Sequence, residues 1–168
     1  VKAAYSSGTP AIGVGSGNAP CLVTADADLG QAAAMIVQSK SFDNGLICGS
    51  EHNLVVEQAA VAPFTAALEA MGAAVLTPDE AAKAVATIVE PKTQALRPQV
   101  IGQSAQRIAD FLGVTRPYPI KLLVVPTEPD LASPMTGEKL TPILSLFAVA
   151  DVDAGIALAQ RLLARQGT

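Results

Sequence analysis

Cys48 is the residue of this sequence best suited to covalent chemistry. It lies in the segment SFDNGLICGS (residues 41–50), directly after a run of turn-forming residues. Reactive groups concentrate in loops that rigid elements carry, and a nucleophilic thiol needs room for the incoming electrophile. Gly49 leaves that room and lets backbone N–H groups approach a developing oxyanion. The pattern makes Cys48 a candidate nucleophile, and a structural free cysteine is the alternative.

His52 is the single histidine of the chain and follows Cys48 by four residues, which suggests a Cys–His pair. Residues four apart face each other on a helix, but the strand-like run NLVVE begins directly after His52. We therefore expect a surface histidine at the entrance of a strand, not a base for the thiol. Cys21, the second cysteine, lies in the apolar run CLV and is expected to be a packed core thiol.

Two other segments suggest ligand binding. GVGSGN contains Gly13, Gly15 and Gly17, but a phosphate cradle requires the spacing G-x-G-x-x-G and a helix directly afterwards. The strand-like CLV follows instead, so a tight turn with close backbone packing is favoured. Glu138 lies in a polar, turn-rich loop from 127 to 141, a kind of loop that is often functional. The residues alone favour a solvated carboxylate there, and a ligand contact is the alternative.

Strands and helices must position these residues. Short apolar runs bounded by turn formers predict strands, and apolar residues at spacings of three and four predict helices. The expected strands are 11–14, 21–23, 53–57, 73–76, 120–125 and 143–149. The expected helices run from 28 to about 41–44, from 58 to 71, from 78 onward, from 104 to 112 and from 151 to 164. This alternation predicts an α/β fold with a largely parallel sheet.

Composition narrows the class of protein. The 168 residues suit one domain with a real core, built mostly from aliphatic residues because only 4% are aromatic. The net charge of −4, without a basic run, argues against nucleic acid and anionic membranes as partners. No apolar run approaches the roughly 20 residues of a membrane-spanning helix. Two cysteines and one histidine make no metal-ligand spacing, so we expect no metal site.

The chain has no secretory signal, which makes the cytoplasm the expected location. Val1 is not a natural start, so we expect a piece of a longer chain. Half of the residues are hydrophobic, which suggests an interface with a missing domain or subunit. An alanine-rich composition explains that fraction equally well. We also expect a homo-oligomer.

Three segments together resemble the catalytic domain of CoA-acylating aldehyde dehydrogenases: VKAAYSSGTPAIGVGSGNAP, SKSFDNGLICGSEHNLVVE and GEKLTPILSLFAVAD. This family includes the aldehyde dehydrogenase half of bifunctional aldehyde–alcohol dehydrogenases. The resemblance runs in family order from Val1 to about Ala164, and FDNGxICxSE around Cys48 is specific. It implies a three-layer catalytic domain over residues 1–168, with a mostly parallel sheet flanked by helices and the cofactor-binding domain upstream of this chain.

The resemblance implies that Cys48 attacks an aldehyde, that the resulting thiohemiacetal passes hydride to NAD, and that the acyl-thioester is transferred to coenzyme A. The reaction is reversible and gives acyl-CoA and NADH. Glu138 matches the glutamate that hydrogen-bonds the nicotinamide ribose, and Leu140 falls where a side chain packs near the nicotinamide ring. The family's oxyanion-hole asparagine also lies upstream, so the isolated 168 residues are expected to be inactive or nearly so.

One departure separates the branches of this superfamily. Hydrolytic aldehyde dehydrogenases have a glutamate in the segment matching AIGVGSGNAP, and it activates water against the thioester. Here Val14, Gly15 and Ser16 offer no carboxylate, which favours the acylating branch. A hydrolytic enzyme and a non-catalytic α/β interaction module with a packed Cys48 are the alternatives. Acetaldehyde is the default substrate of the family, and succinate semialdehyde or a sulfonated aldehyde fits the motifs equally. The choice between NAD and NADP as the cofactor is also open.

Overall fold

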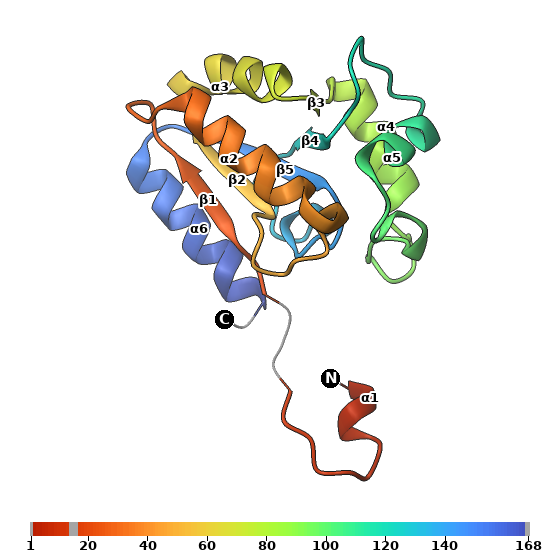
Figure 1. Cartoon of the computed structure of the whole chain (residues 1–168). Coiled ribbons are helices and arrows are strands. Elements are labelled where there is room, and N and C mark those ends of the chain that lie inside the picture. Colours follow the sequence, from red (N-terminus) through yellow and green to blue (C-terminus); the bar gives the residue numbers. More distant parts are fainter. Residues whose placement is uncertain (1, 14–16, 167–168) are drawn as a thin grey trace.

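A computed structural model describes residues 2–13 and 17–166 of the chain. All strand pairs in these ranges are parallel, and they form one sheet in the order β1-β2-β5-β4-β3 (Figure 1). The strands are β1 (Pro20–Val23), β2 (Asn53–Glu57), β3 (Ala73–Val75), β4 (Leu122–Pro126) and β5 (Ile143–Val149). The longer helices are α2 (Leu29–Ser41), α3 (Gln58–Ala70), α4 (Pro78–Ile88), α5 (Ala105–Leu112) and α6 (Val152–Gln166). Short helical turns are α1 (Lys2–Tyr5), η1 (Phe42–Gly45), η2 (Pro98–Val100) and η3 (Pro134–Thr136).

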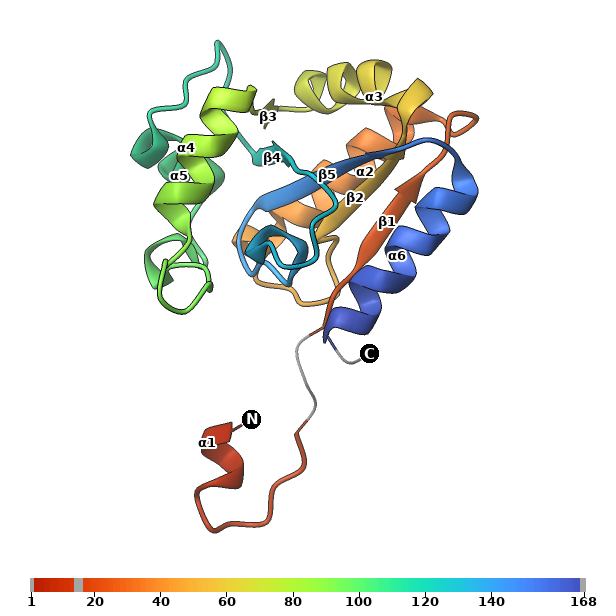
Figure 2. The same ribbon diagram turned by 180° about the vertical axis from the view of Figure 1, so that it is seen from behind.

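Helices cover both faces of the sheet, because successive residues of a buried strand point to opposite sides. Leu54 and Val56 of β2 pack with residues of α2 and α3, whereas Val55 packs with α6. On the face of α6, alternate residues of β4 contact α4 and α5. The two views show the same arrangement (Figures 1 and 2). The predicted three-layer α/β fold with a parallel sheet is confirmed.

Helix boundaries follow local sequence signals. The Asp28 carboxylate accepts a hydrogen bond from the Gln31 N–H (3.0 Å) and caps α2. Gly113 ends α5 in the left-handed conformation, with φ 72°. Within the described ranges, no helix has the length and apolarity that crossing a membrane requires.

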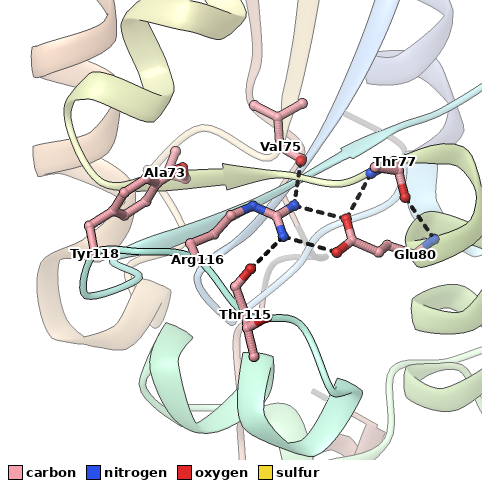
Figure 3. A network of polar contacts seen from close by, with 7 residues as sticks. All are labelled: Ala73, Val75, Thr77, Glu80, Thr115, Arg116 and Tyr118. Carbon is pink, nitrogen blue, oxygen red and sulfur yellow. Dashed lines mark hydrogen bonds and ion pairs between the residues drawn. The ribbon is translucent and has the colours of Figure 1, made fainter.

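Arg116 fastens α4 to the sheet (Figure 3). Its guanidinium donates to both carboxylate oxygens of Glu80, at 2.9 and 2.8 Å, and to the Val75 carbonyl oxygen at 2.8 Å. Glu80 also accepts from the Thr77 N–H, so the capping box that starts α4 and the ion pair share one carboxylate. Hydrogen bonding to Arg116 lowers the pKa of Glu80 to about 2.

The strand expected at 11–14 is wrong for residues 11–13, which have no regular structure. Residues 2–13 lie apart from the sheet in both views, so the segment has no strand to pair with (Figures 1 and 2). Val14, Gly15 and Ser16 lie outside the described residues. Their lack of a carboxylate is therefore an observation on the sequence alone.

The connections preceding β1, β2 and β5 meet at the amino edge of the sheet. These three strands are adjacent and parallel. The segments that lead into them therefore lie side by side, although they are far apart in the sequence. Residues 17–19, 46–52 and 134–142 make up the three connections. Cys48, the candidate nucleophile, lies in one of these connections and therefore at the amino edge of the sheet. This differs from most open α/β sheets, which bind ligands at the carboxyl edge.

Candidate active site

Cys48 follows a tight turn that leaves the end of α2. Asp43, Asn44 and Gly45 adopt the left-handed conformation in succession, with φ 48°, 53° and 72°. A Cβ on Gly45 would lie 2.5 Å from the carbonyl carbon and oxygen of Thr141, so only glycine fits here. The turn therefore presses the nucleophile-bearing connection against the segment that begins β5.

The two thiols differ in access. Cys48 is exposed, whereas Cys21 is half-buried and packs against the core under α2 and α3. Burial raises the pKa of the Cys21 thiol, and the carboxylate of Glu51 adds to that effect. A Cβ built on Gly49 would meet no atom within 4 Å, which confirms the open space expected beside Cys48. Of the two cysteines, Cys48 is the one that an electrophile can reach.

The expectation that His52 is a surface residue is wrong, because its side chain is fully buried. His52 is enclosed because it lies at the start of β2, which runs between β1 and β5, and because the connection before β5 covers this start. Nε2 lies 3.2 Å from the Cys48 carbonyl oxygen, and Nδ1 lies 3.2 Å from the Lys139 amide nitrogen. An amide N–H only donates, so Nδ1 accepts and Nε2 donates to Cys48. His52 thus hydrogen-bonds to the backbone of Cys48 and not to its sulfur.

Lys40 of α2 lies fully buried beneath this turn. Its Nζ donates to Ser50 Oγ at 3.2 Å, to His52 Nδ1 at 3.1 Å and to the Lys139 carbonyl oxygen at 2.8 Å. Burial lowers the pKa of Lys40 to about 8, so the ammonium form prevails at neutral pH. Burial, followed by the charge of Lys40, lowers the pKa of His52 to about 4. A neutral imidazole therefore faces a charged ammonium group.

A second buried polar cluster joins all three connections. Asn53 Nδ2 donates to Asn18 Oδ1 (2.6 Å) and to the Thr136 carbonyl oxygen (3.1 Å). Lys139 Nζ donates to Asn53 Oδ1 at 3.1 Å and to two carbonyl oxygens of the preceding turn. Burial lowers the pKa of Lys139 well below its usual value. These bonds fix the starts of β1, β2 and β5 relative to one another.

The sequence reasoning missed both clusters. One signal was available for Lys40, which continues the spacing of the buried residues Ala33, Ile36 and Val37 along α2. The other members lie in irregular connections or at a strand end, where side-chain periodicity carries no information. Lys139, directly beside Glu138, is the clearest such case.

Glu138 and Leu140 line a cavity of about 300 Å³ at the start of β5. Other residues of its wall are Gln94, Leu96, Ile101 and Arg165. Glu138 is half-buried, and its carboxylate makes no hydrogen bond or ion pair with the part of the chain that the structure describes. The hydrogen bonds of Lys139 place this pair next to the Cys48 turn. A half-buried carboxylate beside an apolar side chain suits a ligand with hydroxyl groups and a flat ring.

A second cavity, of about 530 Å³, lies between α2 and the Cys48 turn. Its wall combines the apolar Met35, Phe42 and Ile47 with polar residues of α2 and the turn, and Gly49, the neighbour of Cys48 in the sequence, completes it. Met35 and Phe42 are exposed. A small uncharged group attached to a carbonyl carbon at Cys48 would find apolar contacts there.

Known proteins resemble this chain over nearly its whole length. The profile of the aldehyde dehydrogenase family matches residues 2–162. The acylating sulfoacetaldehyde dehydrogenase of Cupriavidus necator is 40% identical over 99% of this chain and 34% of its own. An acetylating aldehyde dehydrogenase from Geobacillus thermoglucosidasius is 39% identical with a TM-score of 0.87, covering 99% of this chain and 37% of that one. A propionaldehyde dehydrogenase from Rhodopseudomonas palustris, solved with CoA and an acylated cysteine, is 28% identical with a TM-score of 0.83, covering 97% and 37%.

The chain thus spans about a third of these relatives. Two of the three are named for an acylating or acetylating reaction, and the third holds CoA. These similarities confirm the resemblance that the segments around Cys48 carry. The chain belongs to the aldehyde dehydrogenase family.

Proposed function

We propose that this chain is the nucleophile-bearing part of an NAD-dependent, CoA-acylating aldehyde dehydrogenase whose cofactor-binding domain lies upstream. The observation that carries the proposal is the exposed Cys48, set on a rigid turn with open space at Gly49. The acylated cysteine of the Rhodopseudomonas palustris relative and the acylating reactions named for the other relatives support it.

In the proposed reaction, the thiolate of Cys48 attacks the aldehyde carbon and forms a C–S bond. Backbone N–H groups of the turn stabilise the oxyanion of the thiohemiacetal. Loss of hydride from that carbon leaves an acyl-thioester on Cys48, and a bound nicotinamide supplies the hydride acceptor. Transfer of the acyl group to the thiol of coenzyme A releases the Cys48 thiolate. Exchange between two thioesters changes the free energy little, so the sequence runs in both directions.

The residues at the start of β5 fit a nicotinamide cofactor. The unpartnered carboxylate of Glu138 would accept hydrogen bonds from ribose hydroxyl groups, and Leu140 would contact the face of the ring. Both line one cavity, and the hydrogen bonds of Lys139 with Lys40 and His52 tie their segment to the connection that carries Cys48, which supports this assignment. Glu138 and Leu140 are therefore proposed as cofactor-binding residues and Cys48 as the catalytic one.

The cavity walled by Met35, Phe42 and Ile47, together with the polar Gln38, Ser39 and Ser50, suits a small aldehyde. We further propose a cytoplasmic homo-oligomer, in line with the exposed apolar residues of the described surface.

The full-length protein tests this function through NADH formation from acetaldehyde, with and without coenzyme A. We expect turnover to require coenzyme A, and Cys48→Ser to lower kcat by roughly a thousandfold or more, because it removes the nucleophile. Cys21→Ser is the matched control and should keep kcat within about twofold. Acid formation at full rate without coenzyme A would support the hydrolytic alternative. Iodoacetamide that modifies Cys48 no faster than Cys21 would support the non-catalytic alternative.

A further inference from the structure

The carbonyl groups on either side of the Cys48 side chain are each held by one other side chain. Ser50 Oγ donates to the Ile47 carbonyl oxygen at 2.7 Å, and His52 Nε2 donates to the Cys48 carbonyl oxygen at 3.2 Å. Lys40 Nζ donates to both of these side chains, at Ser50 Oγ and at His52 Nδ1. One ammonium group therefore fixes the two peptide units that set the direction of the thiol.

The same two residues hold the connection before β5. Lys40 Nζ donates to the Lys139 carbonyl oxygen at 2.8 Å, and His52 Nδ1 accepts from the Lys139 N–H at 3.2 Å. Both polar groups of the Lys139 backbone are thus occupied by members of one cluster. Lys139 lies between Glu138 and Leu140, so the cluster fixes the segment that carries the two cofactor-binding candidates.

We propose that Lys40 is a positioning residue that couples the Cys48 turn to the Glu138–Leu140 segment and so keeps the nucleophile and the cofactor contacts in fixed geometry. The catalytic consequence rests on the proposed function, whereas the coupling of the two segments does not. The energetic logic favours this role over simple stabilisation. Lys40 is a fully buried ammonium whose hydrogen bonds all go to uncharged groups; the charges of Glu51 and Glu138 offset the cost of its burial only in part, and such groups stabilise a fold poorly.

Small losses of geometry at this cluster should be costly for the proposed reaction. A shift of about 1 Å in a reacting group lowers rates by roughly a hundredfold. Lys40→Met keeps an unbranched side chain but removes the ammonium donor from Ser50 Oγ, His52 Nδ1 and the Lys139 carbonyl oxygen. His52 Nδ1 still accepts from the Lys139 N–H. The two segments then lose the bonds of Lys40 but keep the His52–Lys139 hydrogen bond, so their relative position is held less tightly while the sheet beneath them remains.

His52 offers a matched pair of substitutions that separates hydrogen bonding from packing. In His52→Gln, the amide N–H₂ replaces the donor to the Cys48 carbonyl and the amide oxygen replaces the acceptor facing Lys40. His52→Leu has a similar volume and neither polar group. Arg116→Met, at the other end of the sheet, controls for general destabilisation, because it removes a partly exposed hydrogen-bond network that does not contact the site.

Hydrogen exchange measured by mass spectrometry on the full-length protein tests the coupling without any need for activity. We expect Lys40→Met and His52→Leu to speed exchange by about tenfold or more in peptides covering residues 46–51 and 137–141. His52→Gln should exchange at nearly the wild-type rate there, and so should Arg116→Met despite its lower Tm. In kinetics, Lys40→Met should lower kcat by about 10- to 100-fold and raise the KM for the nicotinamide cofactor, and His52→Gln should stay within about threefold for both.

Unchanged exchange in a folded Lys40→Met protein would overturn the proposal, as would faster exchange confined to residues 46–51. If Lys40→Met does not fold, the His52 pair decides, and equal exchange in His52→Leu and His52→Gln would count against the coupling. A wild-type protein without CoA-dependent turnover of acetaldehyde, succinate semialdehyde or a sulfonated aldehyde would refute the proposed function, yet the exchange data would still decide the role of Lys40.

Discussion

The neighbours of Cys48 hold its backbone in place and leave its side chain uncovered. The carbonyl of Cys48 is held by a buried histidine, whereas its thiol faces open space beside Gly49. The two glycines of this turn therefore have opposite roles. Gly45 is required by its positive φ and by contact with Thr141, while Gly49 has no structural requirement among the described residues.

Alanine at each glycine separates stability from access. Gly45→Ala should lower the free energy of unfolding by about 2 kcal/mol or more, because a Cβ at 2.5 Å from the Thr141 backbone and a left-handed φ both oppose it. Gly49→Ala should leave the Tm nearly unchanged but slow alkylation of Cys48, since its methyl group fills part of the approach. Thermal unfolding and thiol alkylation rates measure both. A normal alkylation rate in Gly49→Ala would contradict the proposed direction of attack.

At the scale of single residues, the sequence predicted Cys48 as a candidate nucleophile but did not predict the buried side chains that hold its backbone. Cys48 was found because turn formers and glycine have local signatures, and Glu138 because a known motif surrounds it. His52 was wrongly expected at the surface, because the connection before β5 buries it and that connection contacts it through Lys139, 87 residues away in the sequence. Lys40 had a signal in the apolar spacing of α2, yet a lysine on an apolar stripe gives no indication of which distant carbonyl it will bind.

Among the elements, α4 is attached to β3 through a single shared carboxylate (Figure 3). Glu80 closes the capping box of α4 and accepts two hydrogen bonds from Arg116, which also binds the end of β3. Both side chains are partly exposed, at 26% and 16%, so solvent screens part of their attraction. The bidentate geometry still makes this pair stronger than an ordinary surface ion pair.

Glu80→Gln tests this attachment through pH. The folded pKa of about 2 lies below the usual 4.5, so the carboxylate contributes stability that is present above pH 4.5 and is lost as pH falls towards 2. Between these pH values the wild type should lose about 1–2 kcal/mol more than Glu80→Gln, which keeps the capping box but not the charge. Urea unfolding at several pH values measures the difference. Parallel pH profiles for the two proteins would show that the ion pair contributes nothing.

Elements were predicted well wherever their ends have local chemistry. The helix start expected at residue 28 and the helix end expected at residue 112 agree with the structure, where Asp28 caps α2 and Gly113 follows α5 in the left-handed conformation. The failure at residues 11–13 has a physical cause, because an apolar run becomes a strand only if a neighbouring strand accepts its hydrogen bonds. β1 borders the sheet and pairs with β2, and residues 2–13 lie away from both (Figure 1).

For the whole molecule, the site lies on an open edge. The thiol, the cavity at Glu138 and the apolar wall at Met35 and Phe42 all surround the amino ends of β1, β2 and β5, and much of this surface is exposed. Ile12 of the projecting segment is fully exposed as well. Exposed apolar patches beside a reactive group mark surfaces that another domain or subunit covers.

The 168-residue chain alone should therefore have a reactive thiol at Cys48 but no aldehyde dehydrogenase activity. We expect iodoacetamide to modify Cys48 faster than Cys21, because Cys48 is exposed and burial raises the pKa of the other thiol. NADH formation from acetaldehyde, NAD and coenzyme A should be undetectable, because Glu138 and Leu140 contact one part of the cofactor and the remaining contacts lie upstream in the proposed enzyme. Absorbance at 340 nm and mass spectrometry of the alkylated peptides measure the two properties. The full-length protein is the control that must turn over, and NADH formation by the short chain at a comparable rate would show that these residues hold a complete active site.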